Sequence, residues 1–277
     1  MNHLSPHHER VALEYALNNE EMRLEVDDPI EYEITARYLL RHIPERVIVA
    51  DIGVGGGQYS AMLARRGCRT HLVDVSPRLL DAAAAFLRAQ GFGENIASMR
   101  RASATDLSHL TAASCDVVLL LGPLYHLTTG EERRRAVVEA ARILRPRGLV
   151  FAAGINRLTY LRDVVRGDPE EFARRCDFFV DHLFRDGNLT KPDGQPATMH
   201  ITTAAELRAD LAVAFEEVAL AGVESFASKE EGTRAYLGAS PEAREVLLDL
   251  VERTGTTPEG LGDTSHYLYV GRRREGE

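Results

Sequence analysis

A chain of 277 residues with 44% hydrophobic and 27% charged residues can bury a full core, and one domain with substantial insertions is the default organisation. Its formal net charge of −9 argues against a nucleic-acid substrate, because phosphate binding relies on clustered basic residues. No apolar run approaches the roughly 18 residues of a membrane span and the first residues lack an apolar signal core, so we expect a cytoplasmic protein.

The residues with metal-binding or redox chemistry are few. Cys68, Cys115 and Cys176 are widely spaced and odd in number, which fits neither a disulfide framework nor a zinc knuckle. The cluster His7-His8-Glu9 has suitable ligand types, but it lies near a terminus without further ligands at a set spacing. We therefore predict that this cluster is disordered or solvated, and we predict no metal site.

Residues 1–45 are predicted to form an N-terminal helical cap. From Pro29 to Ile43 the apolar residues recur at helical spacing, and Pro44 closes the segment. In residues 1–28 the helical patterns are short and break register, so their packing is left open.

The most informative stretch follows this cap. An apolar run of strand length, Val47 to Ala50, leads into Asp51, and four glycines fall within the next six positions: Gly53, Gly55, Gly56 and Gly57. Helical spacing resumes directly afterwards. A strand, a glycine-rich turn and a helix N-terminus are the usual way in which an α/β sheet holds a nucleotide-like cofactor.

Strand and helix then alternate as far as residue 153. The predicted strands are Arg69 to Val75, residues 95–99, Asp116 to Leu121, and Leu149 to Ala153. Ser76 with Pro77 is a helix start, and Thr129 with Glu132 forms a capping box for another helix. This alternation predicts a parallel sheet with helices on both faces.

The alternation breaks after residue 153. Residues 154–202 hold no obvious strand, and a segment of this length inside a domain is most often a lid or substrate-recognition insert. The pattern returns with the capping box of Thr203 and Glu206 and a strand from Phe215 to Gly222. A helical insert over 224–263, mainly Glu230 to Arg253, precedes a last strand, Ser265 to Gly271.

Two cofactor classes use such a glycine turn, dinucleotides and S-adenosylmethionine. The dinucleotide fingerprint needs a small residue three places after its second glycine, where this chain has Gln58. Asp74, at the end of the second strand, could hold a ribose in either class. The run Asp51-Ile-Gly53-Val-Gly55-Gly-Gly57 instead closely resembles motif I of the class I S-adenosylmethionine-dependent methyltransferases.

Three further stretches carry the same resemblance. Leu72-Val-Asp74-Val-Ser76-Pro77 resembles the second motif, residues 116–126 resemble the fourth strand and its loop, and residues 143–150 resemble the segment that precedes strand five. The resemblance implies a single domain over 1–277 with a Rossmann-like, seven-stranded, mostly parallel sheet and an antiparallel last strand. It implies S-adenosylmethionine as cofactor, S-adenosylhomocysteine as product, and a small-molecule acceptor, since the Asn/Asp-Pro-Pro-Tyr motif of nucleic-acid amino methyltransferases is missing.

By this resemblance the cofactor-binding residues are Asp51, Gly53, Gly55, Gly57, Asp74, Val75, Ser103, Ala104 and Leu121. Arg23 is added because its charge could meet the carboxylate of the cofactor. The chain departs from the family pattern after strand three, where Gly-Asp-Ala is common and Ala102-Ser103-Ala104 stands instead. The Ser103 hydroxyl could replace the missing acid at the adenine amino group, or Asp106 could substitute. Ordinary loop-capping roles for both residues stay open.

Methyl transfer is an in-line displacement that depends on holding the acceptor, and it often needs a base. His126 is the candidate base because it follows the end of strand four, and Tyr125 is expected beside it, although local packing of both is an equal alternative. His182, His200 and Tyr160 are weaker candidates. Tyr15, Tyr32 and Arg23 could close over the methionine end of the cofactor, and ordinary helix-surface or packing roles are the alternative for each.

The acceptor atom is left open among oxygen, nitrogen and carbon, and the oligomeric state between monomer and homodimer. A non-catalytic S-adenosylmethionine-binding module is the main functional alternative. An NAD(P)-dependent oxidoreductase is a weaker alternative, because Gln58 occupies the position where the dinucleotide fingerprint needs a small residue.

Overall fold

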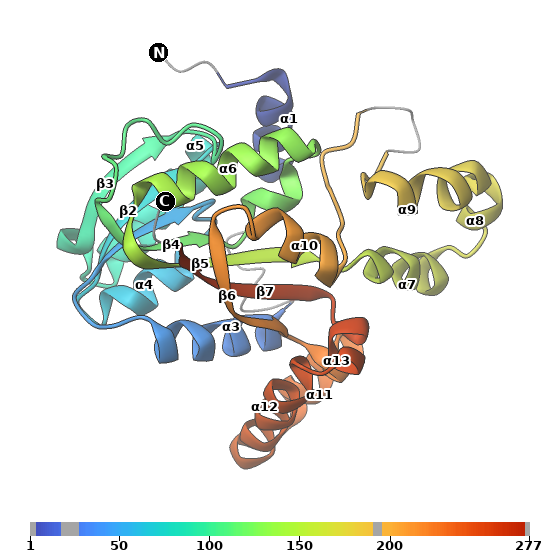
Figure 1. Cartoon of the computed structure of the whole chain (residues 1–277). Coiled ribbons are helices and arrows are strands. Elements are labelled where there is room, and N and C mark those ends of the chain that lie inside the picture. Colours follow the sequence, from blue (N-terminus) through green and yellow to red (C-terminus); the bar gives the residue numbers. More distant parts are fainter. Residues whose placement is uncertain (1–3, 18–27, 191–195, 275–277) are drawn as a thin grey trace.

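A seven-stranded sheet forms the centre of the computed structural model, which describes residues 4–17, 28–190 and 196–274 (Figure 1). The strands are β1 (Ile48–Ile52), β2 (Arg69–Asp74), β3 (Ile96–Arg101), β4 (Cys115–Leu120), β5 (Leu144–Ile155), β6 (Phe215–Gly222) and β7 (His266–Arg273). Their order is β3-β2-β1-β4-β5-β7-β6, and β7 is antiparallel to both of its neighbours. The predicted fold class, a mostly parallel sheet with an antiparallel last strand, is confirmed.

Helices cover both faces of the sheet. The helices next to the sheet are α3 (Pro29–His42), α4 (Gln58–Ala64), α5 (Pro77–Ala89), α6 (Gly130–Ile143) and α10 (Ala204–Leu211). In Figure 1, α3 and α4 lie below the sheet, and α6 and α10 lie above it. Across the described ranges, no helix is both long enough and apolar enough to pass through a lipid bilayer.

The alternation of side chains along β4 shows why its sequence is apolar throughout. Val117 and Leu119 pack in the hydrophobic cluster between the sheet and helices α3 and α4. Val118 and Leu120 pack in the cluster on the other face, between the sheet and helices α6 and α10. All four are at most 1% exposed, so a strand at this position needs apolar residues on both faces. Parallel pairing with both β1 and β5 places this strand at the centre of the sheet.

One N-terminal residue, His8, differs from its prediction. Residues Pro6–Leu17 form a helix, α1, which docks over the ends of the strands with Arg78 donating to the Tyr15 carbonyl at 2.6 Å. His8, predicted to be disordered or solvated, is 7% exposed within this helix. That prediction was wrong because His8 is buried against Ser103, a partner that lies 95 residues away in the sequence.

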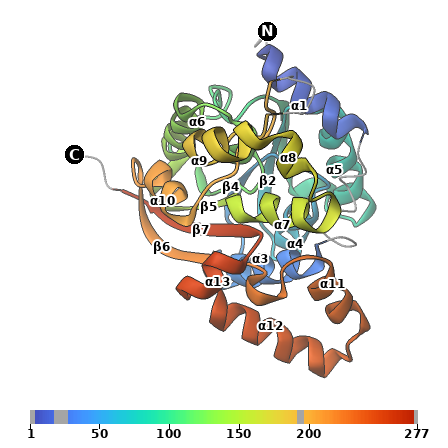
Figure 2. The ribbon, with the colours of Figure 1, turned by 90° about the vertical axis from the view of Figure 1, so that its right-hand side faces the viewer.

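The first insert forms a small lobe beyond the end of the sheet. It contains α7 (Arg157–Gly167), α8 (Glu171–Arg174), the π-helical turn Phe178–His182 and α9 (Leu183–Asp186). The Arg157 guanidinium bonds both carboxylate oxygens of Glu206, at 2.9 and 2.7 Å, and so attaches the lobe to α10. Figure 2 shows α7, α8 and α9 in front of the strand ends.

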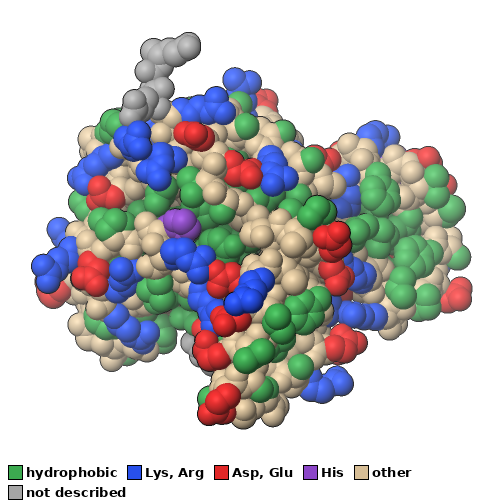
Figure 3. Space-filling model, turned by 60° about the horizontal axis from the view of Figure 1, so that its bottom comes forward, with side chains coloured by type: hydrophobic (Ala, Val, Ile, Leu, Met, Phe, Trp, Pro, Cys, Tyr) green, Lys and Arg blue, Asp and Glu red, His purple; other side chains and the backbone are tan. Residues whose placement is uncertain are grey.

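The second insert, for which a helical segment was predicted, forms a helical hairpin followed by a short third helix. It consists of α11 (Lys229–Gly238), α12 (Pro241–Gly255) and the short α13 (Pro258–Asp263). The break falls where Gly238 ends one helix and the Ser240 hydroxyl caps the next by accepting from the Ala243 amide at 3.3 Å. Arg37 of α3 joins α12 through Glu245 and Asp249, and Figure 3 shows charges of both signs interspersed on this face.

The packing of α3 against the sheet gives a stability prediction. Ile34 is fully buried in this interface, so Ile34→Ala should lower the free energy of unfolding by about 2–5 kcal/mol in urea denaturation. Leu40 lies on the same helix and is 42% exposed, and Leu40→Ala should change that free energy by only about 0.5 kcal/mol. Equal losses in the two variants would contradict the assigned helix face.

Candidate active site

The turn after β1 is held in a conformation that only glycine adopts easily. Gly53 has φ +77°, and a Cβ at this position would lie 2.8 Å from Cδ of Pro123 in the loop after β4. Its amide donates to the Val73 carbonyl of β2 at 2.8 Å. The turn is therefore fixed between the carboxyl ends of two neighbouring strands.

A cavity opens at these strand ends, with an empty volume of about 990 Å³ that includes the solvent at its mouth. Its predicted lining residues are Asp51, Gly53, Gly55, Asp74, Val75, Ser103, Ala104, Leu121, Tyr125 and His126. Residues that the sequence analysis did not assign to the cofactor or the chemistry also line it: His8, Val11, Glu31, Gln58 and Tyr59.

Gly57 does not line the cavity. It has φ +85° and precedes α4, and a Cβ there would lie 3.0 Å from the Cβ of Ala83 in α5. Gly57 therefore allows the two helices to approach. Gln58 is 8% exposed and lines the cavity. It stands at the sequence position where a dinucleotide site needs a small residue.

Asp74 presents a carboxylate whose orientation is fixed by backbone donors. Its Oδ1 accepts from the Ser76 amide at 2.8 Å, and its Oδ2 accepts from the Gly55 amide at 3.3 Å. A Cβ added at Gly55 would meet nothing within 4 Å, so this part of the turn exposes its backbone to the cavity. An acid and an open backbone stretch thus lie side by side at the ligand edge of the sheet.

Asp51 is a buried acid beside this group. It is 4% exposed, and its Oδ2 accepts from the Ser60 hydroxyl at 2.7 Å. The pKa of Asp51 is raised to about 6, chiefly by burial and also by the nearby Asp74, while the hydrogen bond from Ser60 opposes the shift. The site therefore holds a carboxyl group that would favour a neighbouring positive charge.

Ser103 is buried within a hydrogen-bonded group at the end of β3. Its hydroxyl lies 3.1 Å from Nε2 of His8 and 2.9 Å from the hydroxyl of Thr105. Asp106, the alternative acid, does not line the cavity, and its Oδ1 accepts from the Ser108 amide at 3.1 Å. Burial lowers the pKa of His8, which favours its neutral form.

His126 is hydrogen-bonded through both ring nitrogens. Its Nδ1 lies 3.0 Å from the Thr198 carbonyl, which can only accept, so Nδ1 carries the proton. Nε2 then accepts from the Tyr15 hydroxyl at 2.5 Å. Burial lowers the pKa of His126 to about 4, so the ring is neutral at pH 7.

The remaining candidates lie away from the cavity wall. His182 is exposed, His200 bonds Asn188 at 3.1 Å, and Tyr160 bonds Glu171 at 2.7 Å. Tyr32 stacks on Tyr59, while Arg23 lies outside the described residues. Among the described residues of the first insert none lines the cavity; the insert supports the loop after β4 through Thr198 and the His200 amide.

The fold and this site define an α/β protein with a nucleotide-type pocket at the carboxyl ends of its parallel strands. Residues 50–152 match the sequence family described as methyltransferase domain. This methyltransferase domain and the seven-stranded fold support a class I S-adenosylmethionine-dependent methyltransferase, with S-adenosylmethionine as its cofactor.

Curated relatives carry methyltransferase names. A ubiquinone biosynthesis O-methyltransferase of Caulobacter vibrioides is 33% identical over 113 residues, which cover 41% of this chain and 42% of that protein. The chain spans about half the length of the curated relatives it matches.

Two solved structures share the fold. The N-methyltransferase NodS of Bradyrhizobium japonicum, crystallised with S-adenosyl-L-homocysteine, has a TM-score of 0.58 at 17% identity, covering 97% of this chain and 100% of NodS. An S-adenosylmethionine-dependent methyltransferase of Methanosarcina mazei also has a TM-score of 0.58 at 17% identity, covering 86% and 98%.

The raised pKa of Asp51 makes stability depend on pH. An acid whose pKa rises on folding stabilises the fold while protonated, and this contribution is lost as pH rises from about 4 through 6. Asp51→Asn keeps an acceptor for Ser60 and removes the buried charge. The variant should therefore be more stable than the parent at pH 8 by up to about 3 kcal/mol, with no difference below pH 4.

Thermal or urea unfolding across pH 3–8 measures this difference. Asp106→Asn is the matched control, because hydrogen bonds from Ser108 lower the pKa of Asp106 and the substitution should act in the opposite direction. An Asp51→Asn variant that is less stable than the parent at pH 8 would contradict the assigned pKa.

Proposed function

We propose that this chain transfers the methyl group of S-adenosylmethionine to a small-molecule acceptor. The observation that supports this most directly is the cavity itself, where the glycine turn, Asp74 and the loop after β4 meet at one edge of the sheet. The match of residues 50–152 to the methyltransferase domain covers the same elements.

The residues at this edge suit the cofactor. Asp74 would accept hydrogen bonds from the ribose hydroxyls, and Ser103 would face the adenine amino group. The open backbone at Gly55 allows close approach, and Asp51 places a carboxyl group where a cation is favoured. When bound, the cofactor supplies a methyl group on a positively charged sulfur.

The acceptor would enter between α1 and the loop after β4. Val11, Tyr15 and Leu127 line this part of the cavity. The relatives named as ubiquinone biosynthesis O-methyltransferases favour a hydroxyl acceptor, and a hydroxyl must lose a proton during transfer. Tyr15 is the side chain best placed to receive it.

The Tyr15 hydroxyl donates to Nε2 of His126, so its oxygen can accept a hydrogen bond from the acceptor. A proton passed from the acceptor to Tyr15 would move the Tyr15 proton to His126. This role differs from the direct action predicted for His126, whose ring nitrogens are both engaged.

Binding of S-adenosylhomocysteine by calorimetry tests the cofactor assignment. The parent should bind in the micromolar range, and Asp74→Ala should weaken binding by roughly 10- to 100-fold, as expected for loss of hydrogen bonds to a charged group. Asp106→Ala, which removes an acid outside the cavity, should leave the affinity unchanged. Equal affinity of the parent and Asp74→Ala would refute the ribose assignment.

Tyr15→Phe tests the proton route. In a screen of hydroxylated acceptors that detects S-adenosylhomocysteine, this variant should lower kcat by about 100-fold, a typical effect of general acid–base catalysis. Its affinity for S-adenosylhomocysteine should stay unchanged. Cofactor binding without turnover of any acceptor by the parent would instead support a binding module.

A further inference from the structure

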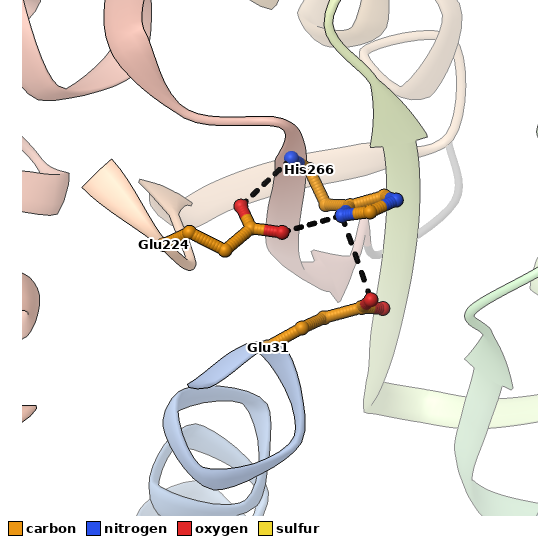
Figure 4. A group of neighbouring side chains, drawn as sticks. All are labelled: Glu31, Glu224 and His266. Atoms are coloured by element: carbon orange, nitrogen blue, oxygen red, sulfur yellow. Dashed lines mark hydrogen bonds and ion pairs between the residues drawn. The ribbon is translucent and has the colours of Figure 1, made fainter. Parts of the chain in front are cut away.

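Three ionisable side chains from distant parts of the sequence meet beside the cavity. Glu31 lies in the first turn of α3, Glu224 follows β6, and His266 is the first residue of β7. One ligand atom from each lies within 4.8 Å of the other two (Figure 4). The sequence analysis singled out none of them, because nothing in their spacing relates them.

The His266 ring lies between the two carboxylates. Its Nδ1 is 2.5 Å from Oε1 of Glu224 and 3.5 Å from Oε2 of Glu31, and Figure 4 shows the same nitrogen directed at both. The side chains of Glu31 and Glu224 are 9% and 6% exposed, and that of His266 is 16% exposed. Both carboxylates have therefore lost most of their hydration.

Three hydrogen-bond donors orient the carboxylate of Glu224. Its Oε2 accepts from the Thr264 hydroxyl at 2.6 Å and from the amides of Ser265 and His266 at 3.1 and 2.9 Å. These donors fix the carboxylate so that Oε1 faces the imidazole. A ligand oriented by an outer layer of hydrogen bonds is typical of metal centres.

Carboxylate oxygens and an imidazole nitrogen are common ligands of divalent metal ions, and this cluster brings two carboxylates and one such nitrogen together in a largely buried place. The Nδ1 proton lies on the short contact with Glu224, whereas a divalent cation in its place would bond to both carboxylates and to the nitrogen. We propose that Glu31, Glu224 and His266 form a divalent metal site.

The donor set selects the kind of ion. One imidazole nitrogen and two carboxylate oxygens suit Mn²⁺, Fe²⁺ or Zn²⁺. Ca²⁺ and Mg²⁺ prefer sites made only of oxygen, so they should bind more weakly.

The position of the site gives it a role that rests on the proposed function. Glu31 also lines the cavity, so the ion would lie at the cavity wall, where it could bind an acceptor hydroxyl and lower its pKa. Such help is needed because burial leaves His126 a weak base, with its pKa lowered to about 4. The ion would acidify the acceptor, and the Tyr15–His126 pair would receive the proton.

Metal titration of the full chain tests the site directly. Protein dialysed against a chelator is titrated with Mn²⁺, read out by electron paramagnetic resonance, and with Zn²⁺ by calorimetry. The parent should bind one ion per chain, and Glu31→Gln should bind it at least about 10-fold more weakly. Thr264→Val, which removes a donor to Glu224, should weaken binding by about 10- to 100-fold.

Glu252→Gln is the matched control. This carboxylate is 17% exposed and pairs with Arg37 and Arg41 at the interface of α3 and α12, away from the cluster. Its loss should leave metal affinity unchanged, and circular dichroism verifies that each variant is folded. A parent that binds neither ion, or a folded Glu31→Gln that binds as tightly as the parent, overturns the site.

S-adenosylhomocysteine binding on the same samples separates the two proposals. Cofactor binding without metal binding refutes the metal site and leaves the proposed function standing. Metal binding without cofactor binding refutes the proposed function and supports the site.

Discussion

The turn between β1 and α4 is the constraint on which the rest of the site depends. The Gly53 amide bonds the Val73 carbonyl, and its Cα faces the Pro123 ring, so β2 and the loop after β4 are both fixed relative to β1. A side chain at Gly53 would separate these elements. The ligand edge of the sheet is therefore set by contacts too close for any residue but glycine.

Local signals allowed much of this framework to be predicted from the sequence. The capping boxes of Thr129 with Glu132 and Thr203 with Glu206 both form, since they need only residues three positions apart. The uninterrupted apolar run of β4 is typical of a strand at the centre of a parallel sheet, where β4 lies. The second insert was predicted only as a helical segment, and the cap at Ser240 that separates α11 from α12 was not identified.

The residues that sequence reasoning missed are those whose roles arise from long-range contacts. The role of His8 depends on its contact with Ser103, and the role of Glu31 depends on its position next to Glu224 and His266. An acid in the first turn of a helix is ordinary, because it complements the helix dipole, so Glu31 carried no distinguishing signal. The same holds for His126, whose place on the chain was recognised but whose hydrogen bond to Tyr15 depends on the docking of α1.

Burial then decides how charge is distributed around the cavity. It raises the pKa of Asp51 and lowers that of His126, so both groups are driven toward their neutral forms where solvent is excluded. A cation that binds beside Asp51 opposes this trend by favouring the carboxylate, and the free energy of binding offsets the cost of ionising it. The negative charge on Asp51 should therefore have two opposite effects: it raises the affinity for a cationic cofactor, and it lowers the stability of the protein without ligand.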